Sequence, residues 1–142
     1  MKLAEFQRLL TQPEKATAGH NYNYANLPSV LNAIRSVGGV GVSQRIDGSA
    51  TLVTKITGID EITDESRFEI PAGFFEPRKG MSSAQIYGSA ITYARRYAVC
   101  AMLGIVGVDE DDDASLEPAP TRSEPSKPVF AVPSVTLSKP NA

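Results

Sequence analysis

Two adjacent arginines, Arg95 and Arg96, stand in the middle of a long stretch that is otherwise mostly apolar. An apolar stretch tends to be buried, and arginine is rarely buried without a partner. The planar guanidinium presents a fork of donors that fits a phosphate group. Thr92 adds a hydroxyl one helical turn before Arg96, and Gly88, which has no side chain, lets a ligand backbone approach closely. This combination favours contact with a phosphate-bearing polyanion.

An internal role is the alternative for the same two arginines. Either side chain would then form a salt bridge with an Asp or Glu of a neighbouring strand or subunit, or lie on a solvated flank. Most arginines in proteins have such structural or exposed roles. The residues of this stretch leave both interpretations open.

The stretch 88–105 is predicted to be an interior helix, because it holds no proline and has glycine near each end. Ser82 or Ser83 is expected to cap this helix. Tyr93 and Tyr97 are four residues apart and therefore share one side of it. Small side chains on the apolar face should let the helix lie close to a sheet. That face comprises Ile91, Ala94, Ala98, Ala101, Met102 and Ile105.

The rest of the folded part is expected to supply short helices and an antiparallel sheet. Apolar residues at helical spacing predict helices over 2–11 and 29–37. Asp47-Gly48 predicts a tight hairpin turn between the first two of three strand-like runs. These runs span 40–46, 49–57 and 66–70. The predicted fold class is therefore α+β: a three-stranded antiparallel sheet packed on a long helix, with N-terminal helices and a disordered C-terminal tail.

Basic residues outside the long helix are further candidates for phosphate contact. Lys55 is expected on the face of the second strand opposite its isoleucine, where Arg45 of the first strand is able to join it. Arg78 and Lys79 follow two phenylalanines in a loop over 71–83, which suggests a stacking and phosphate-gripping flap over the helix. A sheet face kept soluble by charge, and rings anchored in the core or in a subunit contact, are the alternatives.

An aromatic segment over 20–24 alternates polar residues with tyrosines. Tyr24 is a candidate for stacking on nucleic-acid bases, although a ring packed on the domain edge fits the pattern at least as well. His20 is the only histidine and has no cysteine cluster beside it, so the sequence predicts no metal site. No Walker loop, ordered carboxylate pair or activated nucleophile is recognisable, which predicts a protein that is not an enzyme and needs no cofactor.

The net charge of −2 conceals an asymmetry along the 142 residues. Residues 1–108 carry 11 Lys and Arg against 9 Asp and Glu, a charge of +2, whereas residues 109–142 carry 3 against 7, a charge of −4. A mildly basic body with an acidic tail suits a nucleic-acid binder that uses a focused patch. The single cysteine, Cys100, fits a reducing compartment. With no signal peptide and no apolar run long enough for a membrane span, the expected location is the cytoplasm, without membrane contact.

The acidic run 109–113 has two interpretations. A solvated charge run is favoured, because five consecutive acids rarely converge on one ion; a Mg²⁺ site is the alternative. The residues after it, 117–142, are rich in proline and serine and are predicted to form a disordered tail. The expected organisation is thus an N-terminal helix and linker over 1–19, a core over 20–108 and a tail over 109–142.

The helix sequence over 88–98, GSAITYARRYA, resembles the Erf family of phage single-strand annealing proteins. The resemblance continues through LGI at 103–105 and DDD at 111–113. Upstream, YNYANL at 22–27 and VLNAIR at 30–35 match the start of that family. The similar part covers nearly all of the expected folded region, and the helical motif is specific.

This resemblance implies a homologous-recombination protein of a bacteriophage, acting in the bacterial host cell. It implies binding of single-stranded DNA, ATP-independent annealing of complementary strands, and assembly into homo-oligomeric rings or filaments. It also implies a distant likeness to the Rad-type annealing fold, a β-β-β-α core whose long helix lines the DNA groove with basic residues, here Arg95 and Arg96. A phage exonuclease or a host single-strand-binding protein is an expected partner.

Two functions of other classes remain as alternatives. The first is a metal-dependent nuclease that uses the acidic run Asp109–Asp113. The second is an interaction protein that recruits host factors through the proline-rich tail. Incubation with Mg²⁺ and labelled strands separates the nuclease from the annealing protein, because the former requires fragments and the latter requires duplex.

Overall fold

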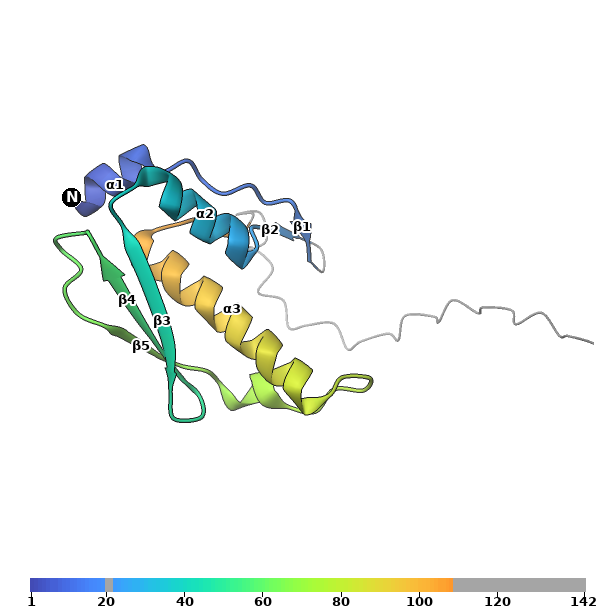
Figure 1. Cartoon of the computed structure of the whole chain (residues 1–142). Coiled ribbons are helices and arrows are strands. Elements are labelled where there is room, and N and C mark those ends of the chain that lie inside the picture. The colour runs from blue at the N-terminus through green and yellow to red at the C-terminus, as the bar shows by residue number, and fades with distance from the viewer. Residues whose placement is uncertain (20–21, 109–142) are drawn as a thin grey trace, which may run out of the picture.

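The computed structural model describes residues 1–19 and 22–108 of the chain. Its elements form an α+β fold with N-terminal helices and a three-stranded antiparallel sheet, which confirms the predicted class. The predicted tail over 109–142 lies outside the described residues. In chain order the elements are α1 (Leu3–Leu9), β1 (Thr17–Ala18), β2 (Asn23–Tyr24), α2 (Leu27–Val37), β3 (Gly41–Asp47), β4 (Thr51–Thr57), β5 (Ser66–Glu69), the 3₁₀ helix η1 (Ala72–Phe75) and α3 (Ser83–Leu103) (Figure 1).

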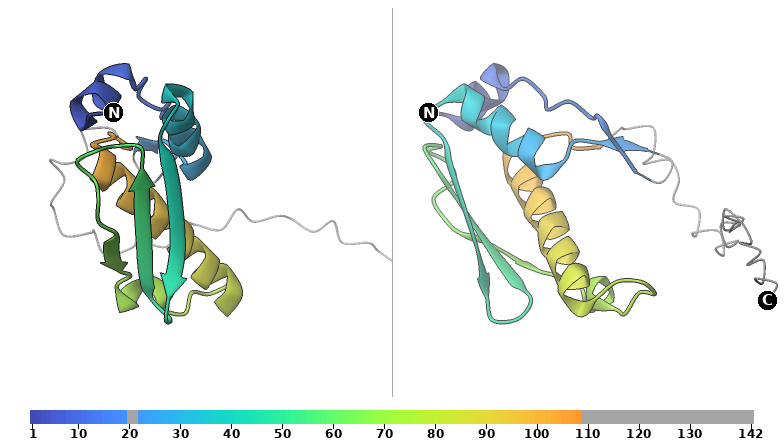
Figure 2. Two further views of the ribbon diagram at one scale, coloured as in Figure 1. Left: turned by 60° about the vertical axis from the view of Figure 1, so that its left-hand side comes forward. Right: turned by 45° about the vertical axis from the view of Figure 1, so that its right-hand side comes forward.

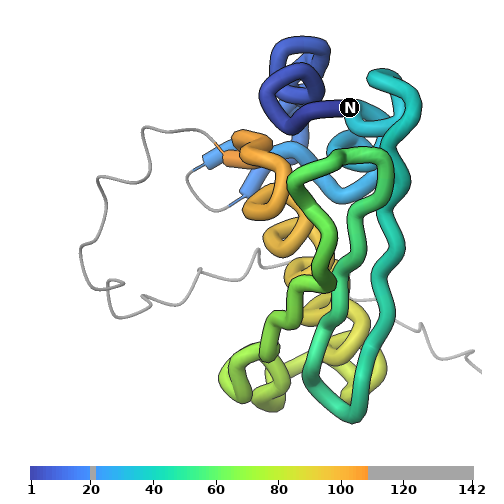
Figure 3. Tube along the Cα trace, turned by 90° about the vertical axis from the view of Figure 1, so that its left-hand side faces the viewer, coloured from blue at the N-terminus to red at the C-terminus, as the bar shows by residue number. Residues whose placement is uncertain are grey.

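The main sheet is a meander of order β3-β4-β5, with both pairs antiparallel (Figure 3). The predicted hairpin turn is present between β3 and β4, where Asp47 pairs with Thr51 and Gly48 has a φ of 70°. A residue without a Cβ adopts that left-handed conformation at little cost. In the central strand Leu52, Thr54 and Ile56 face one way and are buried. Val53 on the opposite face is buried as well, but Leu52 and Ile56 belong to the two core clusters that include α3 residues, so theirs is the face that receives the helix.

Helix α3 is 21 residues long and lies along that buried face of the sheet (Figure 2). A capping box starts it: the Ser82 hydroxyl accepts from the Gln85 amide N–H at 3.2 Å, and the Gln85 side chain accepts from the Ser82 N–H at 2.8 Å. These bonds satisfy two of the donors that a helix start leaves unpaired. Gly104, with a φ of 67°, ends it. Buried alanines at positions 90, 94 and 98 let the helix approach Leu52 closely.

The predicted apolar face of α3 is only partly right. Ala94 and Ala98 are buried as expected, but Ala101 is exposed, and Val99 and Leu103 are completely buried instead. The cause lies outside the helix, because α1 and α2 pack beside its C-terminal half and bury a second stripe (Figure 1). That second cluster includes Phe6, Val30, Ile34, Val99 and Leu103.

A small sheet holds the N-terminal segment against the end of α3. Strands β1 and β2 pair antiparallel, and Tyr24 of β2 also bridges to Val108. The Ala25 amide donates to the carbonyl of Gly107 at 2.9 Å. The sequence predicts an extended segment here but not its partner. These contacts bring Tyr24 beside α3, although the two are far apart in the chain.

None of the helices in residues 1–19 and 22–108 combines the length and the hydropathy that a bilayer span requires.

Candidate nucleic-acid interface

The side of α3 that faces away from the sheet carries an open groove of about 670 Å³. Gly88, Thr92 and Arg96 follow one another at four-residue intervals and therefore lie in a row along it. Tyr24 and the start of α2 form one wall, and the loop residues Gly80 and Met81 contribute to the lining. We call this the outer groove. Four of the predicted site residues, Gly88, Thr92, Arg96 and Tyr24, meet in it.

Arg96 is only 7% exposed, yet its guanidinium lies among tyrosine rings. Its central carbon is 4.3 Å from the ring centroid of Tyr24, 5.2 Å from that of Tyr97 and 5.5 Å from that of Tyr93. One Nη donates to the backbone carbonyl of Ala25 at 3.4 Å. Cation–π contacts stabilise such a charge, but no carboxylate of the described residues pairs with it. The Arg96 guanidinium is therefore held in place, and its positive charge is not neutralised by any carboxylate of the described residues.

Aromatic rings continue from Arg96 along the outer side of α3. Tyr93 and Tyr97 stack with their centroids 4.2 Å apart, and Phe74 lies 5.1 Å from Tyr93. Burial and the neighbouring Tyr97 raise the pKa of Tyr93 well above its ordinary value, so its phenol stays neutral. Tyr97 is 41% exposed and presents ring surface to solvent. The face therefore combines one cation with neutral aromatic surface.

Arg95 does not share this groove, which corrects the expected common channel for the arginine pair. Successive residues of a helix point about 100° apart, and Arg95 turns toward β3, where its Nε donates to the Gln44 side chain at 3.2 Å. It lines a separate cleft between α2 and β3. The two guanidinium groups thus serve different flanks of α3.

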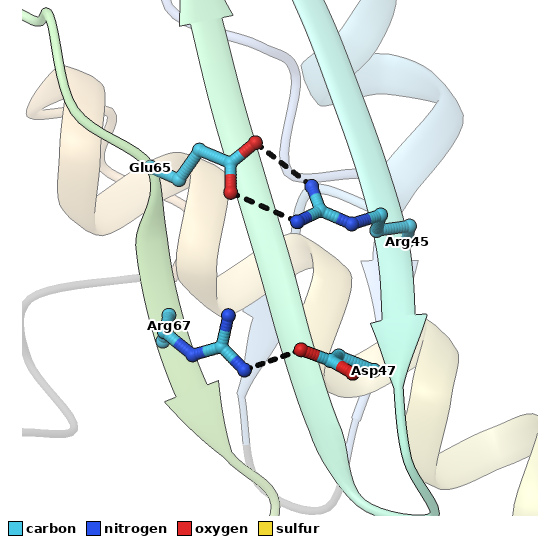
Figure 4. A network of polar contacts seen from close by, with 4 residues as sticks. All are labelled: Arg45, Asp47, Glu65 and Arg67. Atoms are coloured by element: carbon cyan, nitrogen blue, oxygen red, sulfur yellow. Dashed lines mark hydrogen bonds and ion pairs between the residues drawn. The ribbon is translucent and has the colours of Figure 1, made fainter.

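Lys55 and Arg45 lie on the sheet face that points away from α3. Lys55 alternates with the buried Thr54 and Ile56, and Arg45 alternates with the half-buried Gln44 and Ile46. The expected shared face is therefore observed, but it is not the face that carries the outer groove. Arg45 forms a two-pronged ion pair with Glu65, with N–O distances of 2.8 and 2.9 Å, across the central strand (Figure 4). Arg67 forms an ion pair with Asp47 across the same strand (Figure 4). The structure therefore places Lys55 and Arg45 away from the outer side of α3.

The loop before α3 places its two basic residues differently. Arg78 lines a small cleft of about 230 Å³ with Phe74 and Tyr93, and this cleft borders the outer groove through Met81, Ser89 and Tyr93. Lys79 is exposed and lines neither cavity. Phe74 and Phe75 pack against the cluster around Leu52, as the alternative interpretation of these rings expects. Only Arg78 extends the cationic surface beside Arg96.

Comparison with protein-family models decides the family. The model described as the ERF superfamily matches residues 1–130 of the chain. The chain belongs to the ERF superfamily. Comparison with the curated proteins and with the solved structures found no match. Because this superfamily is associated with phage single-strand annealing, membership assigns the chain a general role in recombination and a general interaction with single-stranded DNA.

Within the part of this ERF superfamily chain that the structure describes, the side chains do not form a metal site. No group of three or more His, Cys, Asp and Glu residues gathers there. The acidic run Asp109–Asp113, on which the nuclease alternative depends, lies outside the described residues. Partial burial raises the pKa of the half-buried Cys100 to about 11, which keeps its thiol protonated.

Two residues that contact the paired arginines are not predicted to do so by the sequence pattern, Tyr97 beside Arg96 and Gln44 beside Arg95. The spacing of Tyr97 from Tyr93 indicates a shared side of the helix but no role, and nothing in the sequence distinguishes Gln44. Gln44 contacts Arg95 across 51 positions in the chain, and no local pattern encodes such a pair. A signal is available for Tyr97, because single-strand binders combine basic residues with aromatic side chains on which bases stack.

The two ion pairs across β4, Arg45–Glu65 and Arg67–Asp47, predict a contribution to stability that is lost in acid. Hydrogen bonding to Arg67 holds the pKa of Asp47 below its ordinary value, and Arg45 does the same for Glu65. A carboxyl with a lowered folded-state pKa stabilises the fold above its ordinary pKa of about 4, and that contribution is lost as pH falls through the lower value. The free energy of unfolding in urea should therefore fall more steeply in acid for the wild type than for Asp47→Asn with Glu65→Gln. Equal acid dependence of the two proteins would contradict this.

Proposed function

We propose that the chain binds single-stranded DNA along the outer groove of α3 and anneals complementary strands without ATP. The observation that carries this proposal is the buried guanidinium of Arg96, fixed by tyrosine rings with no carboxylate of the described residues beside it. A buried charge without an anionic partner costs free energy, and a bound phosphate would offset that cost. Membership of a superfamily associated with single-strand annealing supports a nucleic-acid phosphate as that ligand.

The α3 residues that line the outer groove have distinct roles in this proposal. Arg96 donates to a phosphate oxygen, and the hydroxyls of Thr92 and Ser89, which line the same groove, add donors along the backbone. Gly88 lets the sugar-phosphate backbone approach the helix. Tyr97 lies outside the lining of the groove but contacts Arg96 and Tyr93, and its exposed ring stacks beneath one base. Contacts to phosphate leave the other bases free to test a second strand, so binding should tolerate any sequence and weaken with salt.

The annealing reaction needs alignment of two strands rather than bond cleavage. No nucleotide-binding loop is present in the sequence, which supports independence from ATP and a role other than that of an enzyme. We propose that subunits assemble as a ring or filament, so that their α3 helices repeat Arg96 along one continuous strand. A phage exonuclease or a host single-strand-binding protein would then supply or share that strand.

An annealing assay tests the proposed function. Purified protein is mixed with two complementary strands that carry a fluorescent donor and acceptor, with and without Mg²⁺, and without ATP. Energy transfer should rise because duplex forms, and the labelled strands should remain full length on a denaturing gel. Fragments that appear only with Mg²⁺ would instead favour the nuclease.

Replacing Gly88 by alanine is expected to change stability and binding in opposite directions. A Cβ at this position meets no atom within 4 Å in the free protein, and alanine favours a helix over glycine by about 1 kcal/mol. Thermal unfolding should therefore shift upward. Affinity for single-stranded oligothymidylate, measured by fluorescence anisotropy, should fall because the methyl group occupies the path of the backbone. A more stable variant with unchanged affinity would remove Gly88 from the binding path.

A further inference from the structure

A second cationic cleft lies between α2 and β3, on a different flank of α3 from the outer groove. It has a volume of about 320 Å³ and is lined by the guanidinium-bearing residues Arg35 and Arg95 together with Gln44. No acidic residue contributes to this lining. This volume lies at the lower end of the range found for small-molecule sites. Two cations thus face one cavity with no anion beside them in the described part of the chain.

Arg95 is oriented rather than free. Its Nε donates to the Oε1 of Gln44 at 3.2 Å, and the amide nitrogen of Gln44 donates to the Arg95 carbonyl and to the Thr54 hydroxyl, both at 3.0 Å. Every polar group of the Gln44 side chain is therefore engaged, which fixes the arginine through one nitrogen. Among the hydrogen bonds of the described residues, none uses either terminal nitrogen of Arg95. Those two nitrogens form the fork that pairs with a phosphate.

Arg35 completes the cleft from the last turn of α2. It is exposed, and its one described hydrogen bond is a 3.3 Å contact within the same helix, from Nη1 to the side chain of Asn32. None of the ion pairs described for the structure includes Arg35 or Arg95. The remaining donors of both guanidinium groups are available to an oxyanion in the cleft.

This cleft and the outer groove have no lining residue in common. Arg95 and Arg96 therefore line separate cavities, and a second polyanion at Arg95 would not compete with a strand confined to the outer groove. A protein that pairs two strands must hold both close together despite the repulsion between their phosphates. A second, separate set of cations lowers that repulsion.

We propose that Arg35 and Arg95 form a second phosphate-binding site, which captures the incoming complementary strand while the outer groove holds the first. The inference rests on the proposed annealing function. It assigns different work to the adjacent arginines of α3: Arg96 retains the first strand, and Arg95 recruits the second. Gln44 acts as the positioning residue of this second site.

The test compares wild type with Arg35→Gln, Arg95→Gln and the double variant, all as full-length chains. First-strand affinity is measured by fluorescence anisotropy with labelled oligothymidylate. Second-strand capture is measured by stopped-flow energy transfer after a labelled complementary strand is added to the preloaded protein. We expect the double variant to bind the first strand within about threefold of wild type and to capture the second strand at least about tenfold more slowly.

Arg8→Gln is the matched control, since Arg8 is also an exposed arginine in the last turn of a helix, in α1, and lies outside the cleft. It should leave both readouts near wild type. Arg35→Gln alone keeps the test valid if Arg95→Gln disturbs the fold, because Arg35 is a surface residue. Equal decreases in both readouts would place the cleft on the path of the first strand and overturn the proposal. Unchanged second-strand capture would overturn it as well.

A phosphate titration tests the second site without DNA. Inorganic phosphate added to isotope-labelled protein should shift the Nε–H resonance of Arg95, and Gln44→Leu should abolish that shift. An unmoved Arg95 resonance would overturn the site. Failure of the proposed function looks different, because wild-type protein would then bind no single-stranded DNA while Arg95 still responds to phosphate.

Discussion

Replacement of Arg96 by glutamine is expected to lower affinity for single-stranded DNA by about tenfold or more, because a charge-assisted hydrogen bond contributes about 1.5–3 kcal/mol. The annealing rate at limiting protein should fall in proportion. The slope of log affinity against log salt should also become shallower by about 0.7 for each phosphate that the protein no longer neutralises. Fluorescence anisotropy across a salt series measures both quantities.

Two further variants make that result specific. Arg96→Lys keeps the charge but removes the planar fork, and should recover only part of the affinity. Thr92→Glu places a negative charge in the outer groove at an exposed position, and should weaken binding without disturbing the core. Circular dichroism confirms that each variant is folded. A folded Arg96→Gln protein with wild-type affinity and salt slope would show that phosphate does not bind at this guanidinium.

The largest decrease in stability is expected for Gly58→Ala. A Cβ at this position would lie 1.8 Å from the carbonyl oxygen of Gly39, and the residue has a φ of +90° that side chains rarely adopt. Relief of the clash requires the connection between α2 and β3 to move away from the end of β4. We expect the free energy of unfolding in urea to fall by at least about 3 kcal/mol.

Gly38→Ala provides the matched control, because Gly38 has a similar φ of +78° but no atom within 4 Å of the added Cβ. Its cost should be limited to the backbone strain of a side chain at this φ and a ψ of 156°, about 1–3 kcal/mol. The difference between the two variants isolates the backbone contact. Equal destabilisation by the two variants would mean that Gly39 and Gly58 move apart at little cost in free energy. The contact between them would then not hold β3, and Gln44 on it, in position.

Local signals in the sequence are sufficient for most elements of the fold. The helical spacing of Leu3, Phe6 and Leu10 predicts the first helix, and Asp47-Gly48 predicts the hairpin at which β4 turns back on β3. Ser82 is one of two predicted caps of α3, and the structure selects it. Neighbours along the chain form the hairpin turn and the cap, and the apolar spacing of the first helix marks the face that packs on distant elements. Each pattern is therefore visible in the sequence.

The arrangement of the site depends on contacts that no local pattern encodes. Arg96 meets the Ala25 carbonyl across 71 positions, and Arg95 meets Gln44 across 51. Their adjacency in sequence suggests one groove, but the helix turn separates them, and each is then held by a different distant partner. Arg45 is half of an ion pair because β3 and β5 flank the same central strand. Only the packed structure decides these partners.

The central claim, that Arg96 holds a DNA phosphate in the outer groove, is tested most directly by removing the charge from the DNA. Wild type and Arg96→Gln are titrated against two oligothymidylates of equal length, one with phosphodiester linkages and one with uncharged methylphosphonate linkages. The account predicts that wild type binds the phosphodiester strand about tenfold or more tightly than the variant does, and that this ratio falls to about one on the uncharged strand. The same ratio on both strands would contradict the account, because Arg96 would then act on something other than phosphate.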